Sequence, residues 1–225
     1  MITSANPEEG KSLTAANVAV VLAQAGRRVT LIDADLRRPT QHQIFKLNNA
    51  RGLTTILLDT SVTLPDVVQN TTIENLKVMP SGPIPPNPSE LLGSKRMGYL
   101  INALQKQSDV VIFDSPPVLA VADAGVLATR LDGVLLVVDA GHTRRPLARR
   151  AREALTAVNA HVLGVMLNRV DAKAKGYGYY YYDDGQPHRS SNSPAAVLAN
   201  LAARFTRSGR TPTPAHETKS GKSAP

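Results

Sequence analysis

A glycine-containing stretch near the start of the chain has the residue types that bind phosphate. Ser4-Ala-Asn-Pro-Glu-Glu-Gly-Lys-Ser12 follows a short apolar run and opens a segment with helical spacing. In such a loop the backbone N–H groups and the helix N-terminus face the phosphates, while the lysine and the hydroxyl reach phosphate oxygens and Mg²⁺. Ala5 replaces the usual first glycine, so a chance Gly-Lys-Ser at a helix start is the alternative. The residues expected to contact the nucleotide are Pro7, Glu8, Glu9, Gly10, Lys11, Ser12 and Leu13.

Three aspartates follow apolar runs that look like buried strands. Asp33 and Asp35 end the run that begins at Val29, and Asp114 ends the run that begins at Val110. Carboxylate and hydroxyl oxygens are the ligands that Mg²⁺ prefers, so we expect these aspartates and the loop serine to hold the metal. Each aspartate alone is more often a turn or helix-cap residue. The expected catalytic residues are Lys11, Asp33, Asp35 and Asp114, and the expected metal ligands are Ser12, Asp33, Asp35 and Asp114.

Five of the six tyrosines lie within one short segment of a chain that has only three phenylalanines and no tryptophan. A hydrophobic core would scatter its aromatic residues, so this cluster suggests a substrate for phosphorylation. The alternatives are a low-complexity tract or an aromatic recognition patch. The expected phosphoacceptors are Tyr177, Tyr179, Tyr180, Tyr181 and Tyr182.

Apolar runs alternate with helical stretches along the first three quarters of the chain. This alternation predicts an α/β fold, with a mostly parallel sheet covered by helices on both faces. In such sheets, ligands bind beyond the carboxyl ends of the strands. The expected strands are 1–4, 28–33, 76–79, 110–114, 134–139 and 162–167, and the expected helices are 11–25, 88–105, 120–129 and 145–157.

The composition separates three regions. We expect a nucleotide-binding domain over 1–171, a tyrosine-rich segment over 172–185 and a flexible, largely disordered tail over 186–225. Because little precedes the phosphate-binding loop, we expect the first strand to be truncated and the chain to be part of a longer protein.

Charge and cysteine content bear on partners and compartment. The chain has a formal charge of +8, and from Gln186 onward six Lys or Arg residues face a single acidic residue, Glu217. This balance suits an anionic membrane surface; nucleic acid is not the expected partner. The alternative is a solvated tail that binds nothing. The absence of cysteine fits a reducing cytoplasm, and no apolar run approaches the ~20 residues that span a bilayer.

Several segments together resemble the bacterial tyrosine kinases, or BY-kinases. They are the phosphate-binding loop, the stretch from Asp33 to Pro39 (Walker A′ in that family), the stretch from Phe113 to Pro117 (its Walker B), and the tyrosine cluster. His42-Gln-Ile-Phe45 with Gly52-Leu53, and the segment from Gly82 to Leu92, agree as well. The resemblance covers roughly residues 1–182.

The resemblance implies a P-loop NTPase fold, ATP and Mg²⁺ as cofactors, and transfer of phosphate to tyrosine. It implies autophosphorylation of the cluster between subunits and control of exopolysaccharide synthesis and export. It also implies a membrane-embedded polysaccharide co-polymerase or activator as partner, a homo-oligomer, and a location at the inner face of the bacterial plasma membrane. Either Asp33 or Asp35 would accept the tyrosine proton. An arginine-bearing helix that relatives carry upstream of the loop is absent here, which puts ring assembly in doubt.

Three alternatives remain at this point. A MinD-like partitioning ATPase would use the same sheet, but its signature lysine position is occupied by Asn6. A nucleotide-gated adaptor would bind ATP and a membrane protein without turnover. Asn168-Arg-Val-Asp171 partly matches the guanine-binding pattern of GTPases, although we prefer a strand-to-tail turn there and ATP as the nucleotide. The arginines of 144–152 are expected to form a solvated helix face, with Leu147 and Leu155 turned to the core.

Overall fold

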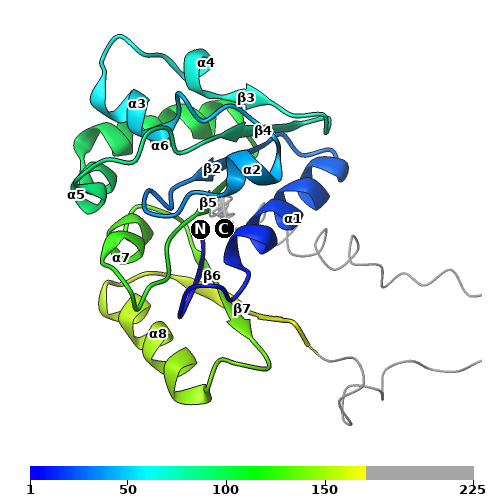
Figure 1. Ribbon diagram of the computed structural model, residues 1–225, viewed down its shortest axis with the longest axis vertical. Helices are drawn as coiled ribbons and strands as arrows, with labels where there is room; N and C mark the ends of the chain where they lie inside the picture. The colour runs from blue at the N-terminus through cyan, green and yellow to red at the C-terminus, as the bar shows by residue number, and fades with distance from the viewer. Residues whose placement is uncertain (171–225) are drawn as a thin grey trace, which may run out of the picture. The chain divides into compact units, whose positions relative to one another are not determined.

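A computed structural model describes residues 1–170 of the chain (Figure 1). Its strands form one sheet in the order β3-β4-β2-β5-β1-β6-β7. All neighbouring strands pair in parallel except β3, which runs antiparallel to β4. The strands are β1 (Ile2–Ser4), β2 (Val29–Asp33), β3 (Gln69–Asn70), β4 (Leu76–Met79), β5 (Val110–Asp114), β6 (Val134–Asp139) and β7 (Val162–Asn168).

Helices flank this sheet as the sequence predicted. In Figure 1, α1 lies to the right of the strands, whereas α5, α7 and α8 lie to their left. Among residues 1–170, no helix is both long and apolar enough to cross a membrane. The helices are α1 (Lys11–Gln24), α2 (Gln41–Ile44), α3 (Leu53–Leu58), α4 (Leu64–Val67), α5 (Pro88–Gly93), α6 (Lys95–Gln107), α7 (Asp123–Ala128) and α8 (Arg145–Ala157).

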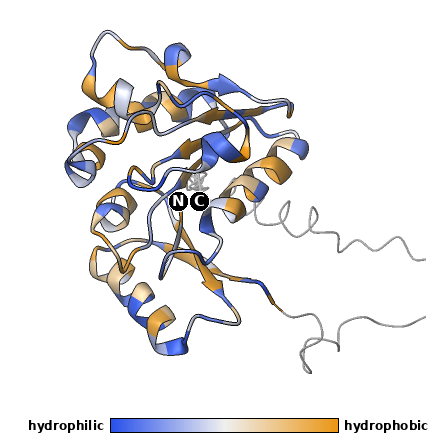
Figure 2. Cartoon of the chain, viewed as in Figure 1, coloured by the Kyte–Doolittle hydropathy of each residue, from blue (hydrophilic) through white to orange (hydrophobic). Residues whose placement is uncertain are grey.

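The sheet is held by apolar side chains packed against the helices. Every residue of β2 is buried, as expected for a central strand covered on both faces. One cluster of buried residues joins β2, β4 and β5 to α3, α5 and α6, and a second joins β6 to α7 and α8. Figure 2 shows the hydrophobic residues that run along these strands. The packed strands place the ends of β1, β2 and β5 beside one another.

Several expected element bounds were wrong. The single helix predicted over 88–105 is two helices, because Ser94 has an extended backbone (φ −67°, ψ 156°) and its hydroxyl accepts a hydrogen bond from the Met97 N–H at 3.1 Å. The helix predicted over 120–129 begins at Asp123, and the strand predicted from Arg28 begins at Val29. The short elements α2, α3, α4 and β3 were not predicted, since four to six residues carry too little periodicity.

The edge strand β7 differs from the central strands. Its residues alternate between half-buried and exposed, with Leu163, Val165 and Leu167 on the exposed face. Only one face of this strand is therefore packed. The predicted boundaries at residues 171 and 185 lie outside the described residues.

Candidate nucleotide and magnesium site

The phosphate-binding loop connects β1 to α1, as the sequence predicted. Two loop residues have left-handed backbones, Glu8 (φ 65°) and Gly10 (φ 89°). Gly10 is also closely approached, because a Cβ atom there would lie 2.1 Å from the Nδ2 atom of Asn168. Both the conformation and the contact therefore require glycine at this position.

The N-terminus of α1 is free to bind an anion. None of the described side chains caps it, and the first turn contains no acidic residue. The leading N–H groups of a helix lack partners within the helix and carry a partial positive charge, which favours phosphate. Pro7 and Glu8 are exposed beside this turn, and Leu13 is 57% exposed. These residues are exposed and do not pack in the core, and their contact with a nucleotide stays a prediction.

Glu9 holds the shape of the loop with its side chain. The buried carboxylate accepts a hydrogen bond from the Ala5 N–H at 2.8 Å and another from the Thr143 hydroxyl. Its backbone carbonyl accepts from the Asn168 side-chain amide at 3.0 Å. Ala5, which replaces the usual first glycine, is fully buried in the core beside α7 and α8.

Asn168 was not predicted to contact the loop. The stretch that begins there was interpreted as a strand-to-tail turn, yet Asn168 is the last residue of β7 and its amide binds Glu9. The next residue, Arg169, donates to Asp139 Oδ2 at 2.8 Å. Asp139 is buried, which raises its pKa, but hydrogen bonds from Arg169, Gly141 and His142 outweigh this effect and lower the pKa to about 2. The fourth residue of the stretch, Asp171, lies outside the described residues.

Lys11 brings the loop and two of the predicted aspartates together. Its Nζ atom lies 2.8 Å from Asp35 Oδ2 and 3.3 Å from Asp114 Oδ1. It also donates to the Ser12 hydroxyl at 2.9 Å. Burial lowers the pKa of Lys11, but the attraction of Asp114 and Asp35 outweighs burial and the net pKa is raised. The ammonium group therefore stays charged at the carboxyl end of the sheet.

Asp33 and Asp114 are direct neighbours on adjacent strands, since they are paired in the register of β2 with β5. Both are fully buried. Burial raises the pKa of Asp33 to about 8, with repulsion from Asp114 as the second cause. Burial likewise raises the pKa of Asp114, although Lys11 opposes the shift. Two carboxylates this close favour a proton or a cation between them.

The two oxygens of Asp33 have different surroundings. Oδ2 accepts hydrogen bonds from the backbone N–H groups of Thr40 and Gln41, both at 2.9 Å, and so supports the start of α2. Oδ1 is buried and has no hydrogen-bond partner among residues 1–170. The helix-cap alternative for Asp33 thus accounts for one oxygen, and the other is available to a ligand.

Gln41 is a site residue that the sequence analysis missed. Its buried side-chain amide donates to Asp114 Oδ2 at 2.8 Å and to the Ser12 carbonyl at 2.9 Å. It thereby connects α2, the start of α1 and the end of β5. Its carbonyl oxygen Oε1 is buried and has no partner in the part of the chain that the structure describes. Nothing in the local sequence marks this glutamine, because its contacts depend on how α2 is folded against the sheet.

The donor set fits Mg²⁺ of the kind that accompanies a nucleotide. Within residues 1–170, no group of three or more His, Cys, Asp or Glu side chains is arranged to hold a metal by itself. Protein-bound Mg²⁺ commonly uses one or two carboxylates and completes its shell with water and phosphate oxygens. Ser12 Oγ, the unpartnered Asp33 Oδ1 and the oxygens of Asp114 are hard donors of that type.

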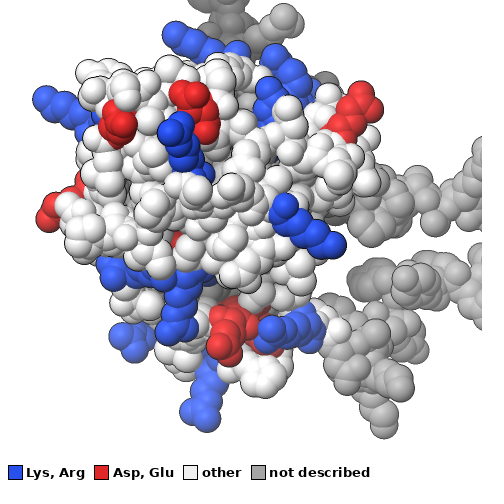
Figure 3. Space-filling view, turned by 45° about the horizontal axis from the view of Figure 1, so that its top comes forward, with Lys and Arg blue, Asp and Glu red and all other residues white. Residues whose placement is uncertain are grey.

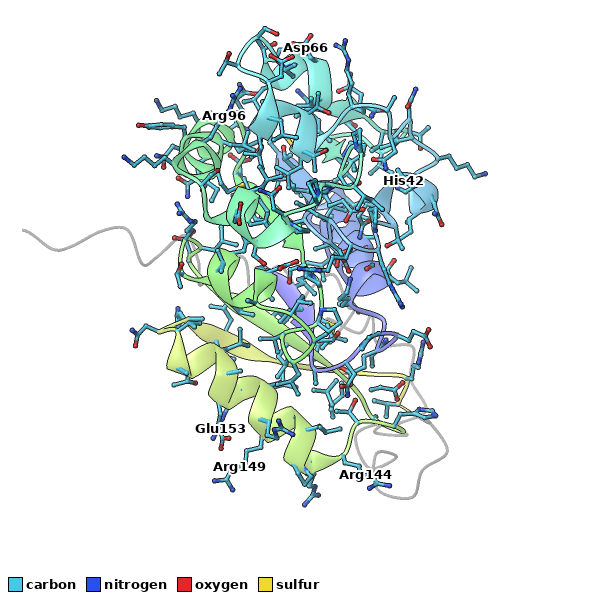
Figure 4. All side chains as sticks on the ribbon, turned by 60° about the vertical axis from the view of Figure 1, so that its left-hand side comes forward. His42, Asp66, Arg96, Arg144, Arg149 and Glu153 are labelled. Atoms are coloured by element: carbon cyan, nitrogen blue, oxygen red, sulfur yellow. The ribbon has the colours of Figure 1, made fainter. Side chains whose placement is uncertain are left out.

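The arginines of α8 lie on its outer side, as expected. Figure 4 shows Arg144 and Arg149 pointing away from the ribbon, and Arg149 pairs with Glu153 at 2.9 Å. Leu155 is buried as predicted, whereas Leu147 is only half-buried. The exposure of Arg149 and Arg150 fits the interpretation of these arginines as a solvated face. On the face of the molecule shown in Figure 3, acidic side chains lie among the basic ones.

The sheet, the loop and the strand-end carboxylates define a P-loop NTPase. Residues 7–145 match the family described as an AAA domain. Over 181 residues the chain is 51% identical to tyrosine-protein kinase YwqD of Bacillus subtilis, covering 80% of this chain and 76% of that protein. It is 39% identical to putative tyrosine-protein kinase CapB of Staphylococcus aureus over 184 residues, or 82% of this chain and 80% of that one. The chain belongs to the family of bacterial tyrosine kinases.

Solved structures agree with this assignment. The kinase domain of the Escherichia coli tyrosine kinase ETK is 36% identical, covers 80% of this chain and 71% of its own, and superimposes with a TM-score of 0.73. A septum site-determining protein MinD from Pyrococcus horikoshii is 20% identical, covers 74% of this chain and 68% of its own, and has a TM-score of 0.61. At that identity only the fold is shared, so the MinD-like alternative gains no functional support.

Proposed function

We propose that this kinase transfers the γ-phosphoryl group of Mg²⁺-ATP to tyrosines of its own C-terminal cluster, on a neighbouring subunit. The observation that carries the proposal is the position of Lys11, between Asp35 and Asp114 at the open N-terminus of α1. Phosphoryl transfer depends mainly on positioning and on charge stabilisation. A cation, free backbone N–H groups and carboxylates at one sheet edge supply both.

Lys11 would exchange one set of anionic partners for another. Its ammonium group pairs with the carboxylates of Asp35 and Asp114. When ATP binds, the ammonium group would turn to the β- and γ-phosphates, and the N–H groups at the start of α1 would bind phosphate oxygens. Ser12, Asp33 and Asp114 would hold Mg²⁺, directly or through water, and the metal would neutralise charge on the phosphate oxygens.

When Lys11 turns to the phosphates, the Asp35 carboxylate becomes available as a base. Asp35 Oδ1 stays bonded to the backbone N–H groups of Arg37 and Arg38, at 3.3 Å and 3.0 Å, while Oδ2 loses its partner. Asp35 Oδ2 would then accept the proton of the tyrosine hydroxyl as the phenolic oxygen bonds to the γ-phosphorus. The bond from that phosphorus to the bridging oxygen breaks, and ADP leaves with the electron pair. Asp33 would serve the metal, since one of its oxygens already supports α2.

The phosphoacceptors would be Tyr177 and Tyr179 to Tyr182, which lie outside the described residues. Each phosphate adds a charge of about −1.5 to −2, so several together would drive neighbouring subunits apart. Membership of the bacterial tyrosine kinase family supports control of exopolysaccharide synthesis and export, with a membrane-embedded co-polymerase or activator as partner. That partner would bring the kinase to the inner face of the plasma membrane.

One experiment separates this function from its alternatives. The protein is incubated with labelled ATP and Mg²⁺, with and without a candidate activator segment, and the products are mapped. Phosphotyrosine within residues 177–182 is the expected result. Release of free phosphate without phosphotyrosine would point to an ATPase switch, and nucleotide binding without any turnover would point to an adaptor. Either result would overturn the proposal.

A further inference from the structure

The Walker A′ loop that carries Asp35 is fastened to two distant helices. Arg37 donates to Asp123 twice, from Nε to Oδ2 at 2.8 Å and from Nη2 to Oδ1 at 3.1 Å. The hydroxyl of Ser89 also donates to Asp123 Oδ1. Asp123 is the first residue of α7, and Ser89 lies in the first turn of α5. One carboxylate thus connects the loop after β2 with both helices. We call Arg37, Ser89 and Asp123 together the junction.

Burial makes this junction more than a surface ion pair. Asp123 is fully buried, whereas the Arg37 side chain is 43% exposed. Burial raises the pKa of Asp123, but hydrogen bonds from Arg37 and Ser89 outweigh that effect and the net pKa is lowered. A two-pronged arginine–carboxylate pair fixes orientation as well as distance, unlike most exposed pairs.

The junction is continuous with the proposed reaction site through Asp35. The backbone N–H of Arg37 donates to Asp35 Oδ1, and the other oxygen of Asp35 contacts Lys11. Arg37 is therefore held at its backbone by Asp35 and at its guanidinium group by Asp123. A loop without the second attachment would leave the Asp35 carboxylate less well placed, and misplacement of about 1 Å can cost roughly 100-fold in rate.

We propose that Asp123 is a positioning residue for phosphoryl transfer, which acts through Arg37 to fix the Asp35 carboxylate while touching neither nucleotide nor tyrosine. This inference rests on the kinase activity proposed above. It predicts that Asp123 and Arg37 act as one unit. Loss of either should lower kcat, whereas the affinity for Mg²⁺-ATP, which depends mainly on the loop and α1, should change little.

The chain offers a control pair of the same chemistry. Arg28 donates to Asp109 Oδ1 from Nε at 3.2 Å and from Nη2 at 2.7 Å. This pair lies just before β2 and β5 begin, at the amino ends of these parallel strands, whereas the site lies at their carboxyl ends. The Asp109→Ala substitution therefore removes an Arg–Asp pair that joins the segments just before β2 and β5. It does not disturb the loop that carries Asp35.

The test compares Asp123→Ala, Arg37→Met and the double variant with Asp109→Ala, all assayed well below their unfolding temperatures. We expect each single variant at the junction to lose roughly tenfold or more in kcat with KM for ATP changed less than about threefold, and the double variant to lose no more than either. Asp123→Asn, which keeps one acceptor oxygen, should lose less. Asp109→Ala should keep the parental kcat.

A kcat within about twofold of the parent in folded Asp123→Ala, or losses that multiply in the double variant, would overturn the inference. Hydrogen exchange provides a readout that does not depend on activity. The Arg37 and Arg38 backbone amides should exchange faster in Asp123→Ala than in the parent, and at the parental rate in Asp109→Ala. Equal protection of these amides in the parent and in Asp123→Ala would also refute the positioning role. If the parent transfers no phosphate to tyrosine, the proposed function fails and exchange alone decides the inference.

Discussion

Lys11 Nζ lies 2.8 Å from Asp35 Oδ2, and the two side chains are only 9% and 4% exposed. This lysine thus neutralises two carboxylates, Asp35 just after β2 and Asp114 at the end of β5. The same side chain stabilises these carboxylates and would bind the nucleotide. This double role changes what a substitution at Lys11 should do.

Lys11→Met should abolish phosphoryl transfer and also destabilise the nucleotide-free protein. Methionine would leave Asp35 and Asp114 without their cation. Removing one partner of a buried pair costs on the order of 3 kcal/mol. Denaturant unfolding should show this loss at neutral pH, and unchanged ATP turnover in the folded fraction would refute the loop assignment.

Asp114→Asn should weaken Mg²⁺-nucleotide binding without unfolding the sheet. Asparagine keeps the shape of the side chain and can still accept the hydrogen bond from Gln41. It removes a negative charge that would face the metal, so the Mg²⁺ dependence of nucleotide binding should decrease. Calorimetric titrations of ATP with Mg²⁺ and with EDTA measure this dependence. An equal effect of Mg²⁺ in parent and variant would remove Asp114 from the metal shell.

The ionisation of Asp33 should make the metal-free protein less stable as pH rises. Its pKa in the folded protein is about 8, above the ordinary value of 3.8. The folded state therefore holds the proton more tightly, so the stabilising contribution is complete below pH 3.8 and is lost as pH rises through 8. The free energy of unfolding should fall by up to about 1.4 kcal/mol per pH unit within this window.

Asp33→Asn provides the control for this pH effect. Asparagine does not titrate, so in EDTA the stability of the variant relative to the parent should increase from pH 5 to pH 8. Denaturant titrations at several pH values give the difference. A difference that stays constant with pH would show that Asp33 is already ionised in the folded protein.

The sequence predicted the central features of the fold well because they are encoded locally. The runs Val29–Asp33 and Val110–Asp114 are continuous β-branched and apolar segments, and both form buried or partly buried strands within a residue of the predicted bounds. The loop with Gly10 and Lys11 follows β1 and opens α1 as predicted. Local pattern and tertiary structure agree at these positions.

The missed features depend on contacts between distant segments. Gln41 reaches Ser12 and Asp114, and Asn168 reaches Glu9, across separations that no local pattern describes. The different surroundings of the two Asp33 carboxylate oxygens also depend on distant segments. They follow from the pairing of β2 with β5 and from the start of α2. The tyrosine cluster lies outside the described residues, so its role as substrate stays a prediction.

Deletion of residues 186–225 should reduce binding to acidic vesicles and spare catalysis. The deleted segment carries six Lys or Arg residues against one Glu, and each basic residue near an anionic surface contributes up to about 1 kcal/mol at low salt. Binding should also weaken as salt is raised, because the attraction is screened. Vesicle sedimentation at two salt concentrations, with neutral vesicles as control, tests this. Equal binding by the truncated protein would mean that the tail does not dock on lipid.

Phosphorylation of the cluster should occur between subunits. The last strand ends at Asn168, and only eight residues separate it from Tyr177. At about 3.3–3.6 Å per residue, such a tether spans up to about 26–29 Å. It also starts beside the loop, because Asn168 donates to the Glu9 carbonyl, so tether length leaves both the same chain's site and a neighbour's site within reach. The donor and the acceptor must therefore be separated to test the direction of transfer.

A mixing experiment achieves this separation. A folded Lys11→Met protein keeps its tyrosines but lacks the phosphate-binding lysine, and an active protein truncated after Lys175 keeps its site but lacks the cluster. Neither can label its own tail. We expect label on Tyr177 to Tyr182 of the inactive partner, at a rate that rises with protein concentration, since the encounter is bimolecular. If the mixture gives no label while the full-length active protein labels itself at a rate independent of concentration, transfer occurs within one chain and the intersubunit mechanism is wrong.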